Sequence, residues 1–496
     1  MSLPPVHPVG PPPLARRIFF GYALVALAFL GLAIATEWYW MAGIPVLLWV
    51  VGQAVMDFRV FFWLLLTMIP VSTVVFLPGG LSTDLPTEPL AIGLTGIFIV
   101  HALKHWPAYQ RKTFGHPIAL LLYLHVGWIL VSTVFSPGFL VSLKFSLAKL
   151  WYVGAYFLVP LLVLKTPRHV QLFAHCIFWP LLFVALQTLV RHAAFGFSFA
   201  MQHKTMHPFM SEHVSYAGCL ATFTPWLVYL AWSRWHRGGS IWWLAGIIGP
   251  LWLAAIYFSY TRAAFVALAL AAVAFFVVRW RLLKPALLAA VVVALGAAFY
   301  LLNDNKYLDY APNYDTTITH ERFDNLISAT YKLEDISTME RFYRWIAAGH
   351  MIPYRPVTGW GPGNFVEFYR GYTVNAFRTY VSENPEGSGI HSYYLMTLVE
   401  QGFPGLLIFL TYIFGVLLIG ERIYHRKRDP ATRNAVMAAI LAMLIVDAFN
   451  IINDQMETDK IGAQFLLNAA ILIVMDRYSP DEGHRDPEAG DTTQQA

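Results

Sequence analysis

The sequence predicts an all-α, polytopic integral membrane protein. Hydrophobic residues make up 57% of the 496 residues and charged residues only 13%, which is about half the charged share of an average soluble domain. The mean hydropathy is +0.53. Apolar runs of about 17–22 residues recur along the whole chain, and this is the length that crosses the hydrocarbon core of a bilayer. About fourteen membrane helices fit this pattern, with one large extramembrane loop that contains short amphipathic helices.

The expected helices follow from the positions of the apolar runs. In chain order they are residues 18–36, 39–56, 60–77, 90–104, 118–136, 149–164, 170–190, 214–233, 241–259, 263–280, 284–302, 404–421, 433–452 and 462–478. These runs divide the chain into a first group of eleven helices, the large loop, the last three helices and a tail, at residues 1–302, 303–403, 404–478 and 479–496.

The distribution of basic residues predicts the orientation. If Arg16 and Arg17 are cytoplasmic, almost every basic loop residue falls on the same side, whereas the short outer loops hold few. The inner loops then carry Arg59, Lys104, Arg111, Lys112, Lys165, Arg168, Arg234, Arg237, Arg279, Arg281, Lys284, Arg422, Arg426, Lys427, Arg428 and Arg433. Cytoplasmic loops are the ones that carry excess Lys and Arg. We therefore expect both termini in the cytoplasm, the loop at 303–390 outside, and a disordered acidic tail at 479–496.

Composition also excludes some classes of function. The isoelectric point of about 9.0 reflects short basic clusters between apolar runs, and these are topology signals rather than a surface for nucleic acid. Cys176 and Cys219 both lie within apolar runs, so we expect them to be packed side chains rather than a disulfide or a metal site.

The long loop has its own predicted structure. Residues 337–340, Ser-Thr-Met-Glu, form a capping-box pattern, so a helix should begin there and run to about Ile352. Phe342, Trp345, Ile346 and Gly349 fall on one side of it, which predicts an amphipathic helix lying against the membrane domain. Three glycines and a proline between 358 and 365 predict a forced turn. A second helix should begin near Ser392 and meet the next membrane helix at 402–404.

Three places in the sequence, which comprise four residues, are candidates for chemistry. Arg262 lies between two apolar helices, where an arginine is costly without a partner or a function, although it could also snorkel to the interface. Arg341 and Arg344 share a predicted helix face and could grip phosphate oxygens, or could pair with Glu340 or Asp335. His391 begins a helix near these arginines, which should disfavour its charged form. A neutral imidazole suits a general base, whereas the alternative is a structural histidine.

The predicted outer loop at 191–213 is a second candidate site. It carries Arg191, Lys204, Glu212 and His213. We interpret it as a basic, outward-facing entrance that binds an anionic lipid headgroup. The spacing of His203, His207 and His213 does not match a zinc pattern, so we expect no metal ion.

Three ordered motifs together resemble the O-antigen ligase and O-antigen polymerase superfamily. They are Arg341-Phe-Tyr-Arg-Trp345, the run from Ile352 to Phe365, and the run from His391 to Gly402. Thr261-Arg262-Ala263 is similar to that family's arginine between two membrane helices. The resemblance covers residues 250–420, and the long outward loop is also in the family position.

The resemblance implies an inner-membrane glycosyltransferase of the bacterial cell envelope, working on the periplasmic side without a cofactor or a metal. It implies a glycan donor on undecaprenyl diphosphate, and an acceptor hydroxyl on a lipid A core or another glycan. Applied to this chain, His391 would be the general base, Arg262 and Arg341 would stabilise the leaving diphosphate, and transfer would invert the anomeric centre. Arg344, Arg191, Lys204, Glu212 and His213 would bind substrate. Membrane lipids are the remaining expected partners.

Two alternatives remain open at the level of sequence. A repeat-unit polymerase of the same superfamily would share all of these features. A lipid or polysaccharide transporter would need charged residues facing one another within the membrane and broken helices. The intramembrane charges noted in the apolar runs are few, chiefly Asp447.

Overall fold

The computed structural model describes residues 57–77, 81–105, 111–310, 336–378, 382–384 and 387–478, together with a few positions between 21 and 45. The chain forms two compact units, residues 1–61 and 62–496. In the first unit, the Tyr22 hydroxyl donates a hydrogen bond to the Pro45 carbonyl over 2.8 Å. The helices expected at 18–36 and 39–56 lie mostly outside the described residues, as do Arg16, Arg17 and the tail at 479–496.

The second unit confirms an all-α polytopic membrane protein. Eight of the described helices are long and apolar enough to cross a membrane. They are α6 (Pro117–Val134), α7 with η3 and α8 (Phe139–Val153, Gly154–Leu158 and Val159–Val163), α9 (Pro167–Ala193), α11 (His213–His236), α13 (Arg262–Arg279), α14 (Leu283–Leu302), α18 (Tyr393–Arg426) and α19 (Pro430–Ile452). Each overlaps an expected helix, whereas the total of about fourteen stays a prediction.

Further elements complete the described chain. They are α3 (Arg59–Met68), β1 (Thr73–Leu77), β2 (Leu81–Leu85), α4 (Thr87–His105), α5 (Arg111–Phe114), η4 (Phe199–Met201), α10 (Gln202–Met206), η5 (Leu244–Ile248), α12 (Gly249–Tyr257), η6 (Asn303–Tyr310), α16 (Ile336–Met351), η7 (Ile352–Tyr354), α17 (Phe365–Phe368), η8 (Tyr369–Tyr372), η9 (Asn375–Phe377), η10 (Gln455–Glu457) and α20 (Asp459–Tyr478).

The helix predicted at 60–77 is wrong in its second half. Helix α3 ends at Met68, and β1 and β2 form an antiparallel hairpin in which Thr73 pairs with Leu85 and Leu77 pairs with Leu81. Pro70 cannot donate to a helical ladder, and the β-branched run that follows it favours extended backbone. The whole segment is apolar, so its hydropathy did not indicate the change from helix to strand.

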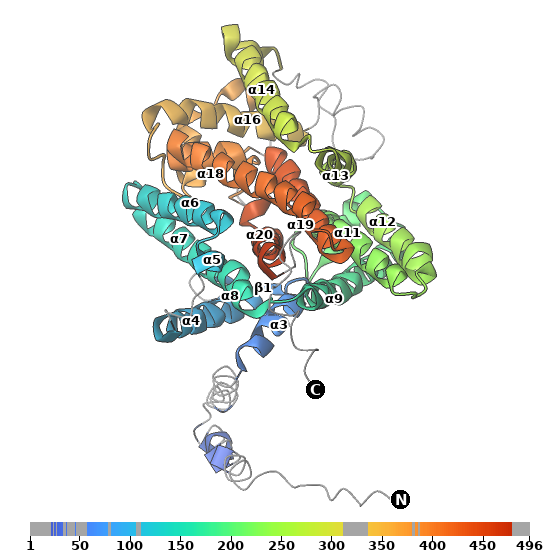
Figure 1. Cartoon of the computed structure of the whole chain (residues 1–496). Coiled ribbons are helices and arrows are strands. Elements are labelled where there is room, and N and C mark those ends of the chain that lie inside the picture. Colours follow the sequence, from blue (N-terminus) through green and yellow to red (C-terminus); the bar gives the residue numbers. More distant parts are fainter. Residues whose placement is uncertain are drawn as a thin grey trace, which may run out of the picture. The chain divides into compact units, whose positions relative to one another are not determined.

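Helix α19 occupies the centre of the second unit. It packs against α11, α13, α18 and α20, and α18 packs in turn against α6 (Figure 1). Small residues such as Ala435, Ala439 and Ala442 are fully buried along α19, and small side chains allow membrane helices to approach closely. The opposite case is α14, on which Val293 and Phe299 are 70% and 74% exposed, as befits a helix that faces lipid.

The long helix α18 is broken at Gly402, where a helix junction was predicted. Gly402 has φ 72° and ψ −176°, a region that is essentially restricted to glycine. A Cβ atom there would lie 2.2 Å from the Val357 carbonyl oxygen. The neighbouring Phe403 N–H donates to the Pro356 carbonyl over 2.8 Å. Only glycine therefore lets the polar loop dock against α18 at this break.

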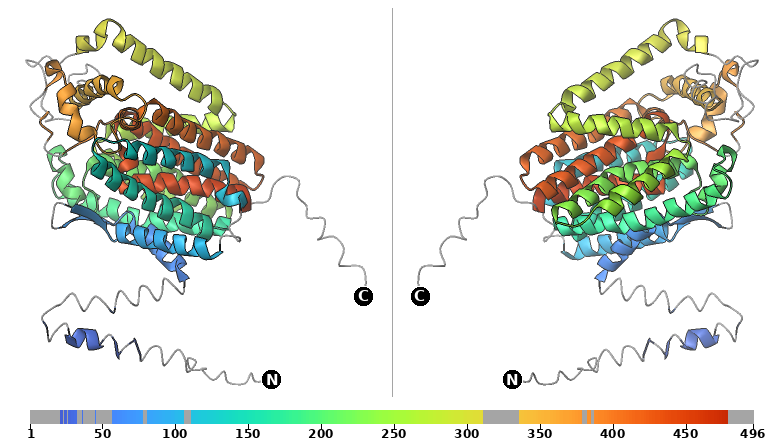
Figure 2. Two further views of the ribbon diagram at one scale, coloured as in Figure 1. Left: turned by 90° about the vertical axis from the view of Figure 1, so that its left-hand side faces the viewer. Right: turned by 90° about the vertical axis from the view of Figure 1, so that its right-hand side faces the viewer.

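The amphipathic helix of the loop is confirmed as α16, which lies across one end of the long helices (Figure 2). Its buried stripe is different from the predicted one. Met339, Tyr343, Ala347 and Met351 are buried, whereas Gly349 is exposed. These residues follow an i, i+4 spacing. The sequence placed the stripe one position away because Phe342 and Trp345 are large and apolar; both instead border a cavity.

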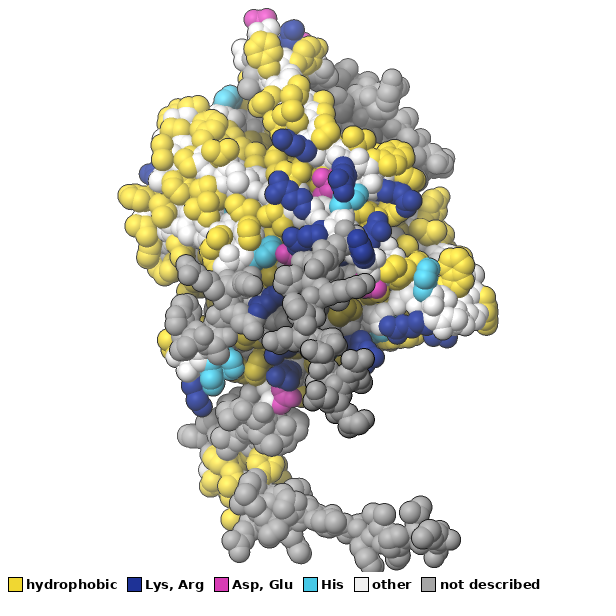
Figure 3. All heavy atoms as spheres, in the orientation of Figure 1, with side chains coloured by type: hydrophobic (Ala, Val, Ile, Leu, Met, Phe, Trp, Pro, Cys, Tyr) yellow, Lys and Arg dark blue, Asp and Glu magenta, His cyan; other side chains and the backbone are white. Residues whose placement is uncertain are grey.

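Lys and Arg side chains gather on the face shown in Figure 3. At the end of α18 and the α13–α14 turn, Arg281, Arg422 and Arg426 border a hollow of about 300 Å³. The sequence assigns all three to inner loops, so this clustering is consistent with the predicted orientation.

Candidate functional site

A cavity of about 660 Å³ brings together distant parts of the chain. The arginines that line it are Arg262 and Arg341, and no described Asp or Glu lines it. The apolar part of the lining includes Phe199, Val266, Ala267, Phe342, Trp345, Ala448 and Ile452. A positively charged region beside an apolar wall suits a ligand with an anionic head and a hydrocarbon tail.

The turn before α13 places Arg262 in this cavity. Tyr260 adopts a positive φ of 56°, and its hydroxyl donates to the Phe197 carbonyl over 2.5 Å. The Thr261 hydroxyl donates to the His213 carbonyl at the start of α11 over 3.2 Å. Arg262 is the first residue of α13. The turn is therefore tied to two neighbouring segments, and Arg262 begins its helix from a fixed position.

Helix α16 supplies the second cavity arginine. The Arg341 Nε donates to the Ile452 carbonyl at the end of α19 over 3.1 Å. One turn further on, the Trp345 indole donates to the Ile390 carbonyl over 3.1 Å. These two hydrogen bonds join α16 to the end of α19 and to the segment that precedes α18. Arg262 and Arg341, almost eighty residues apart in the sequence, thereby line one cavity.

Arg344 takes a different position from Arg341. It is only 5% exposed, its Nη1 donates to the Gly389 carbonyl over 3.0 Å, and its Nη2 lies 3.5 Å from the Glu340 carboxylate. The pairing with Glu340 is the alternative that the sequence left open, although in a buried setting rather than a solvated one. Arg344 does not line the cavity, and direct contact with a substrate is left as a prediction.

The loop at 191–213 contributes part of the cavity wall. Gln202, His203 and His213 line it, and the two imidazole rings lie edge to face with their centroids 4.8 Å apart. Among the described residues, no three His, Cys, Asp or Glu side chains form a group that could hold a metal ion.

The other three loop residues predicted to bind substrate lie elsewhere. Arg191 donates to the carbonyls of His207 and Lys204, so it fastens the loop to the end of α9. The Lys204 side chain is exposed, and Glu212 occupies the N-cap position of α11. None of the three lines the cavity, so their contact with a substrate remains a prediction that the geometry does not support.

His391 lies beside the two loop arginines. Burial, followed by the charges of Arg344 and Arg341, lowers the pKa of His391 to about 3, as the sequence led us to expect. Its φ is 59°, and its backbone N–H donates to the Asp454 carboxylate over 2.8 Å. The imidazole is therefore neutral at physiological pH and sits next to the guanidinium charges, although it does not itself line the cavity.

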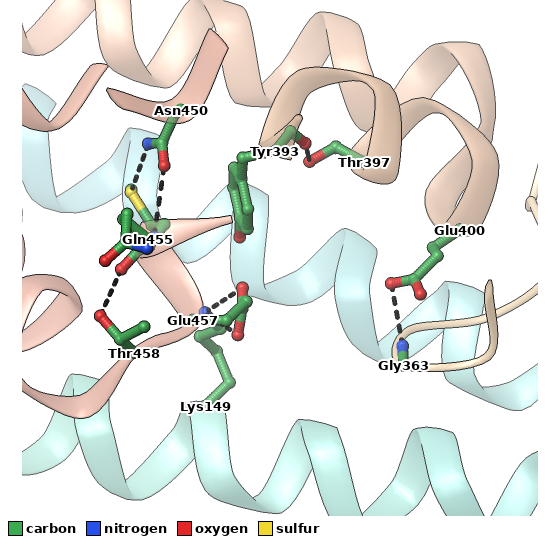
Figure 4. A network of polar contacts seen from close by, with 10 residues as sticks. Lys149, Gly363, Tyr393, Thr397, Glu400, Asn450, Gln455, Glu457 and Thr458 are labelled. Atoms are coloured by element: carbon green, nitrogen blue, oxygen red, sulfur yellow. Dashed lines mark hydrogen bonds and ion pairs between the residues drawn. The ribbon is translucent and has the colours of Figure 1, made fainter. Parts of the chain in front are cut away.

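The glycine-rich turn at 358–365 fixes α16 relative to α18. Gly359, Gly361 and Gly363 all have positive φ, as predicted. The Glu400 carboxylate of α18 accepts the backbone N–H of Gly363 over 2.9 Å (Figure 4). It also accepts the backbone N–H of Phe365 over 3.1 Å. Glu400 is 2% exposed. Glu400 is not among the residues expected from the sequence, although a carboxylate within the apolar run after His391 is the kind of signal that marks a functional position.

Replacing Glu400 is expected to loosen this turn. Glu400→Ala leaves two buried N–H groups without acceptors, each costing about 1–3 kcal/mol, whereas Glu400→Gln keeps one acceptor oxygen. We expect the apparent unfolding temperature of the purified protein to fall in the order wild type, Gln, Ala. Glu367→Ala, on the short helix of the same loop, is the control. Equal unfolding temperatures for Glu400→Ala and wild type would show that the turn does not depend on this carboxylate.

The fold and the cavity define a polytopic membrane protein in which the loop helix α16 brings Arg341 into one cavity with Arg262 of a helix junction. His391, just before α18, lies beside Arg341 and Arg344. The model of the family described as O-Antigen ligase matches residues 251–410. This stretch contains Arg262, Arg341 and His391, and the match confirms the family resemblance that the motifs indicated. None of the curated proteins compared matches the chain.

Proposed function

We propose that this chain is a membrane glycosyltransferase of the O-antigen ligase type, which moves a glycan from undecaprenyl diphosphate to an acceptor hydroxyl. The observation that carries the proposal is one cavity lined by Arg262 and Arg341, with a neutral imidazole beside Arg341. The family match over residues 251–410 supports the same conclusion. The enzyme would work in the bacterial inner membrane, with the site on the periplasmic side and both termini in the cytoplasm.

The cavity suits the donor in both charge and polarity. Arg262 and Arg341 would hold the diphosphate, because guanidinium groups match phosphate oxygens and stay charged at every relevant pH. The first part of the polyprenyl chain would contact the apolar side chains of Val266, Ala267 and Ala448. Two guanidinium groups supply positive charge where negative charge grows on the leaving group, so the proposed step requires no metal ion.

The proposed reaction is a single displacement. The acceptor oxygen forms a bond to the anomeric carbon as the bond from that carbon to the phosphate oxygen breaks. Undecaprenyl diphosphate leaves with the electron pair, and the acceptor proton passes to the ring of His391, which later releases it to water. Attack opposite the leaving group inverts the anomeric centre. The arginines supply electrostatic stabilisation, and His391 supplies the base.

This account predicts a particular pH dependence. The negative charge of a bound diphosphate offsets the positive charge of the arginines near His391. The pKa of His391 should therefore be higher in the complex than its value of about 3 in the empty site. Because the base must be neutral, the rate falls as pH drops through this pKa. In pH profiles of the purified enzyme, the acid limb of kcat should therefore lie at higher pH than that of kcat/KM.

One neighbouring carboxyl group must be separated from this effect. Burial raises the pKa of Asp454 to about 6, and Asp454 accepts the backbone N–H of His391. Asp454→Asn keeps an acceptor oxygen and removes the titration. If the acid limb of kcat disappears in Asp454→Asn, the limb belongs to Asp454 and the predicted shift of His391 is wrong.

The direct test of the function is transfer by the purified full-length protein in detergent. The donor is an undecaprenyl-diphosphate-linked glycan, and the acceptor arms are a lipid A core glycolipid and a second molecule of the donor. Formation of a glycosylated product with release of undecaprenyl diphosphate is expected, and it would be inconsistent with pure transport. A monodisperse protein that transfers to neither acceptor would contradict the proposal.

A further inference from the structure

A second cavity, of about 330 Å³, lies between different helices. It is bordered by β2, α4, α6, α7, α18, α20 and the segment between α19 and α20. The polar lining residues are Ser82, Thr83, Asp84, Glu88, His125, Lys144, Lys149, Tyr152, Tyr393, Tyr412, Glu457, Thr458 and Asp459. The proposed reaction assigns no role to any of them.

The polar groups of this cavity are of both kinds, donors and acceptors. Lys149 Nζ donates to the Glu457 carboxylate over 2.9 and 3.1 Å, and the Tyr152 hydroxyl donates to the Asp459 carboxylate. The Tyr393 hydroxyl points toward Glu457 (Figure 4). These pairs hold the charged groups in place, so that their remaining hydrogen-bonding capacity is preorganised around the cavity.

Two buried lining groups have no hydrogen-bond partner among the described residues. They are Nδ1 of His125 and the hydroxyl of Tyr412, on side chains that are 4% and 1% exposed. Leaving a buried polar atom unpaired costs about 1–3 kcal/mol, and such atoms are rare in native structures. Both atoms belong to residues that line the cavity, and a bound polar ligand would satisfy them.

The charge of the cavity decides which kind of ligand fits. Burial and the neighbouring Asp84 raise the pKa of Asp459 to about 8, so this group is largely protonated at neutral pH. The three other carboxylates, of Asp84, Glu88 and Glu457, still outnumber the two lysines, so a phosphate or another anion would be repelled. A sugar without an anionic group fits better. Each of its hydroxyls both donates and accepts, and the rings of Phe145, Tyr152 and Tyr393 offer flat apolar surfaces for its C–H faces.

We infer that this second cavity binds the neutral sugar that carries the acceptor hydroxyl; the inference rests on the proposed function. The segment between α19 and α20 contributes lining residues to both cavities. Ile452 and Asn453 line the first, and the residues from Met456 to Asp459 line the second. His391 hydrogen-bonds to Asp454 between them, and Tyr393, two residues on, lines the second. His391 lines neither cavity, but it is joined to the segment that contributes to both, and from there it would take the proton of an acceptor bound in the second cavity.

Blocking the cavity provides the first test. Ala148→Trp places an indole in the second cavity, and Leu147→Trp puts the same group on the exposed side of α7, where Leu147 is 46% exposed. With the donor saturating and a lipid A core glycolipid as the varied acceptor, Ala148→Trp should raise the acceptor KM at least about tenfold, equivalent to about 1.4 kcal/mol. The donor KM and the Leu147→Trp kinetics should not change.

His125→Phe provides a test that folding defects cannot imitate. The ring stays against Tyr412 and Phe409, while the unpaired nitrogen is removed, so the empty protein should unfold at the same or a higher temperature. The acceptor KM should nevertheless rise. If both variants are folded and active with an unchanged acceptor KM, the acceptor does not bind here. If the wild type transfers to no acceptor, the proposed function fails instead.

The same assay separates the two sources of acceptor and tests the charge argument. A donor molecule used as the acceptor, in place of the lipid A core glycolipid, tests whether a lipid-linked glycan binds the same cavity, since Ala148→Trp should then raise its KM as well. An acceptor whose terminal sugar carries a carboxylate should bind more weakly than its neutral counterpart in the wild type. Tighter binding of the anionic sugar would overturn the inference.

Discussion

His391→Ala is expected to lower kcat by about 10²–10⁴, the usual contribution of a positioned general base. The imidazole is held neutral by burial and by the charges of Arg344 and Arg341, and we propose that it takes the acceptor proton. Carrier binding should stay close to the wild-type affinity, because the two cavity arginines remain. Single-turnover transfer and binding of undecaprenyl diphosphate, both measured on purified protein, separate these two effects.

The matched control is His350→Ala. His350 is an exposed histidine at the end of α16, with one ring hydrogen bond to the Tyr372 carbonyl over 3.0 Å. The His350→Ala protein should transfer the glycan at the wild-type rate. Full glycan transfer by a well-expressed His391→Ala protein would remove the base assignment and leave this histidine a structural role at the start of α18.

Arg341→Ala is expected to lower kcat/KM by about 10²–10³, the range found when one preorganised electrostatic donor is lost. Arg341→Lys keeps the charge but loses the planar, two-pronged geometry, so it should fall between alanine and wild type. Arg262→Ala should resemble Arg341→Ala. The change should appear in carrier affinity as well as in rate, because a diphosphate is bound in both the ground state and the transition state.

Arg341 also has a structural bond, to the Ile452 carbonyl, so folding needs its own control. Arg370→Ala removes an exposed arginine of the same loop that donates to the Glu383 carbonyl. The unfolding temperature of every variant should be compared with that of this control. An Arg341→Ala protein with wild-type stability and undiminished transfer would show that the cavity is not where the donor binds.

Local sequence patterns were sufficient to predict those parts of the site whose conformation is determined by residues close by in the sequence. The pattern at residues 337–340 predicts a helix that runs to about Ile352, and α16 is described from Ile336 to Met351. The glycines at 359, 361 and 363 have the backbone geometry that was expected. The helix junction at Arg262 follows from two apolar runs with almost no linker. Each of these features depends on neighbours within a few positions, so one sequence suffices.

The remaining features depend on contacts between distant segments. Glu400 holds a turn almost forty residues earlier, and Arg344 is buried against Gly389 and Glu340 rather than standing beside Arg341 in the cavity. Arg191 fastens its own loop. A helical wheel gives the angle between two side chains but not what packs on each face. This is why the sequence placed Arg341 and Arg344 on one helix face as possible phosphate ligands, although they lie in two environments.

The most direct test of the account is the affinity of the purified protein for undecaprenyl diphosphate, compared with undecaprenyl monophosphate. The account predicts that the wild type prefers the diphosphate, and that Arg262→Ala and Arg341→Ala each lose about tenfold or more of that affinity, while Arg370→Ala and His391→Ala lose little. Equal affinity for the two lipids, unchanged by removing either cavity arginine, would contradict the claim that this basic cavity holds the donor.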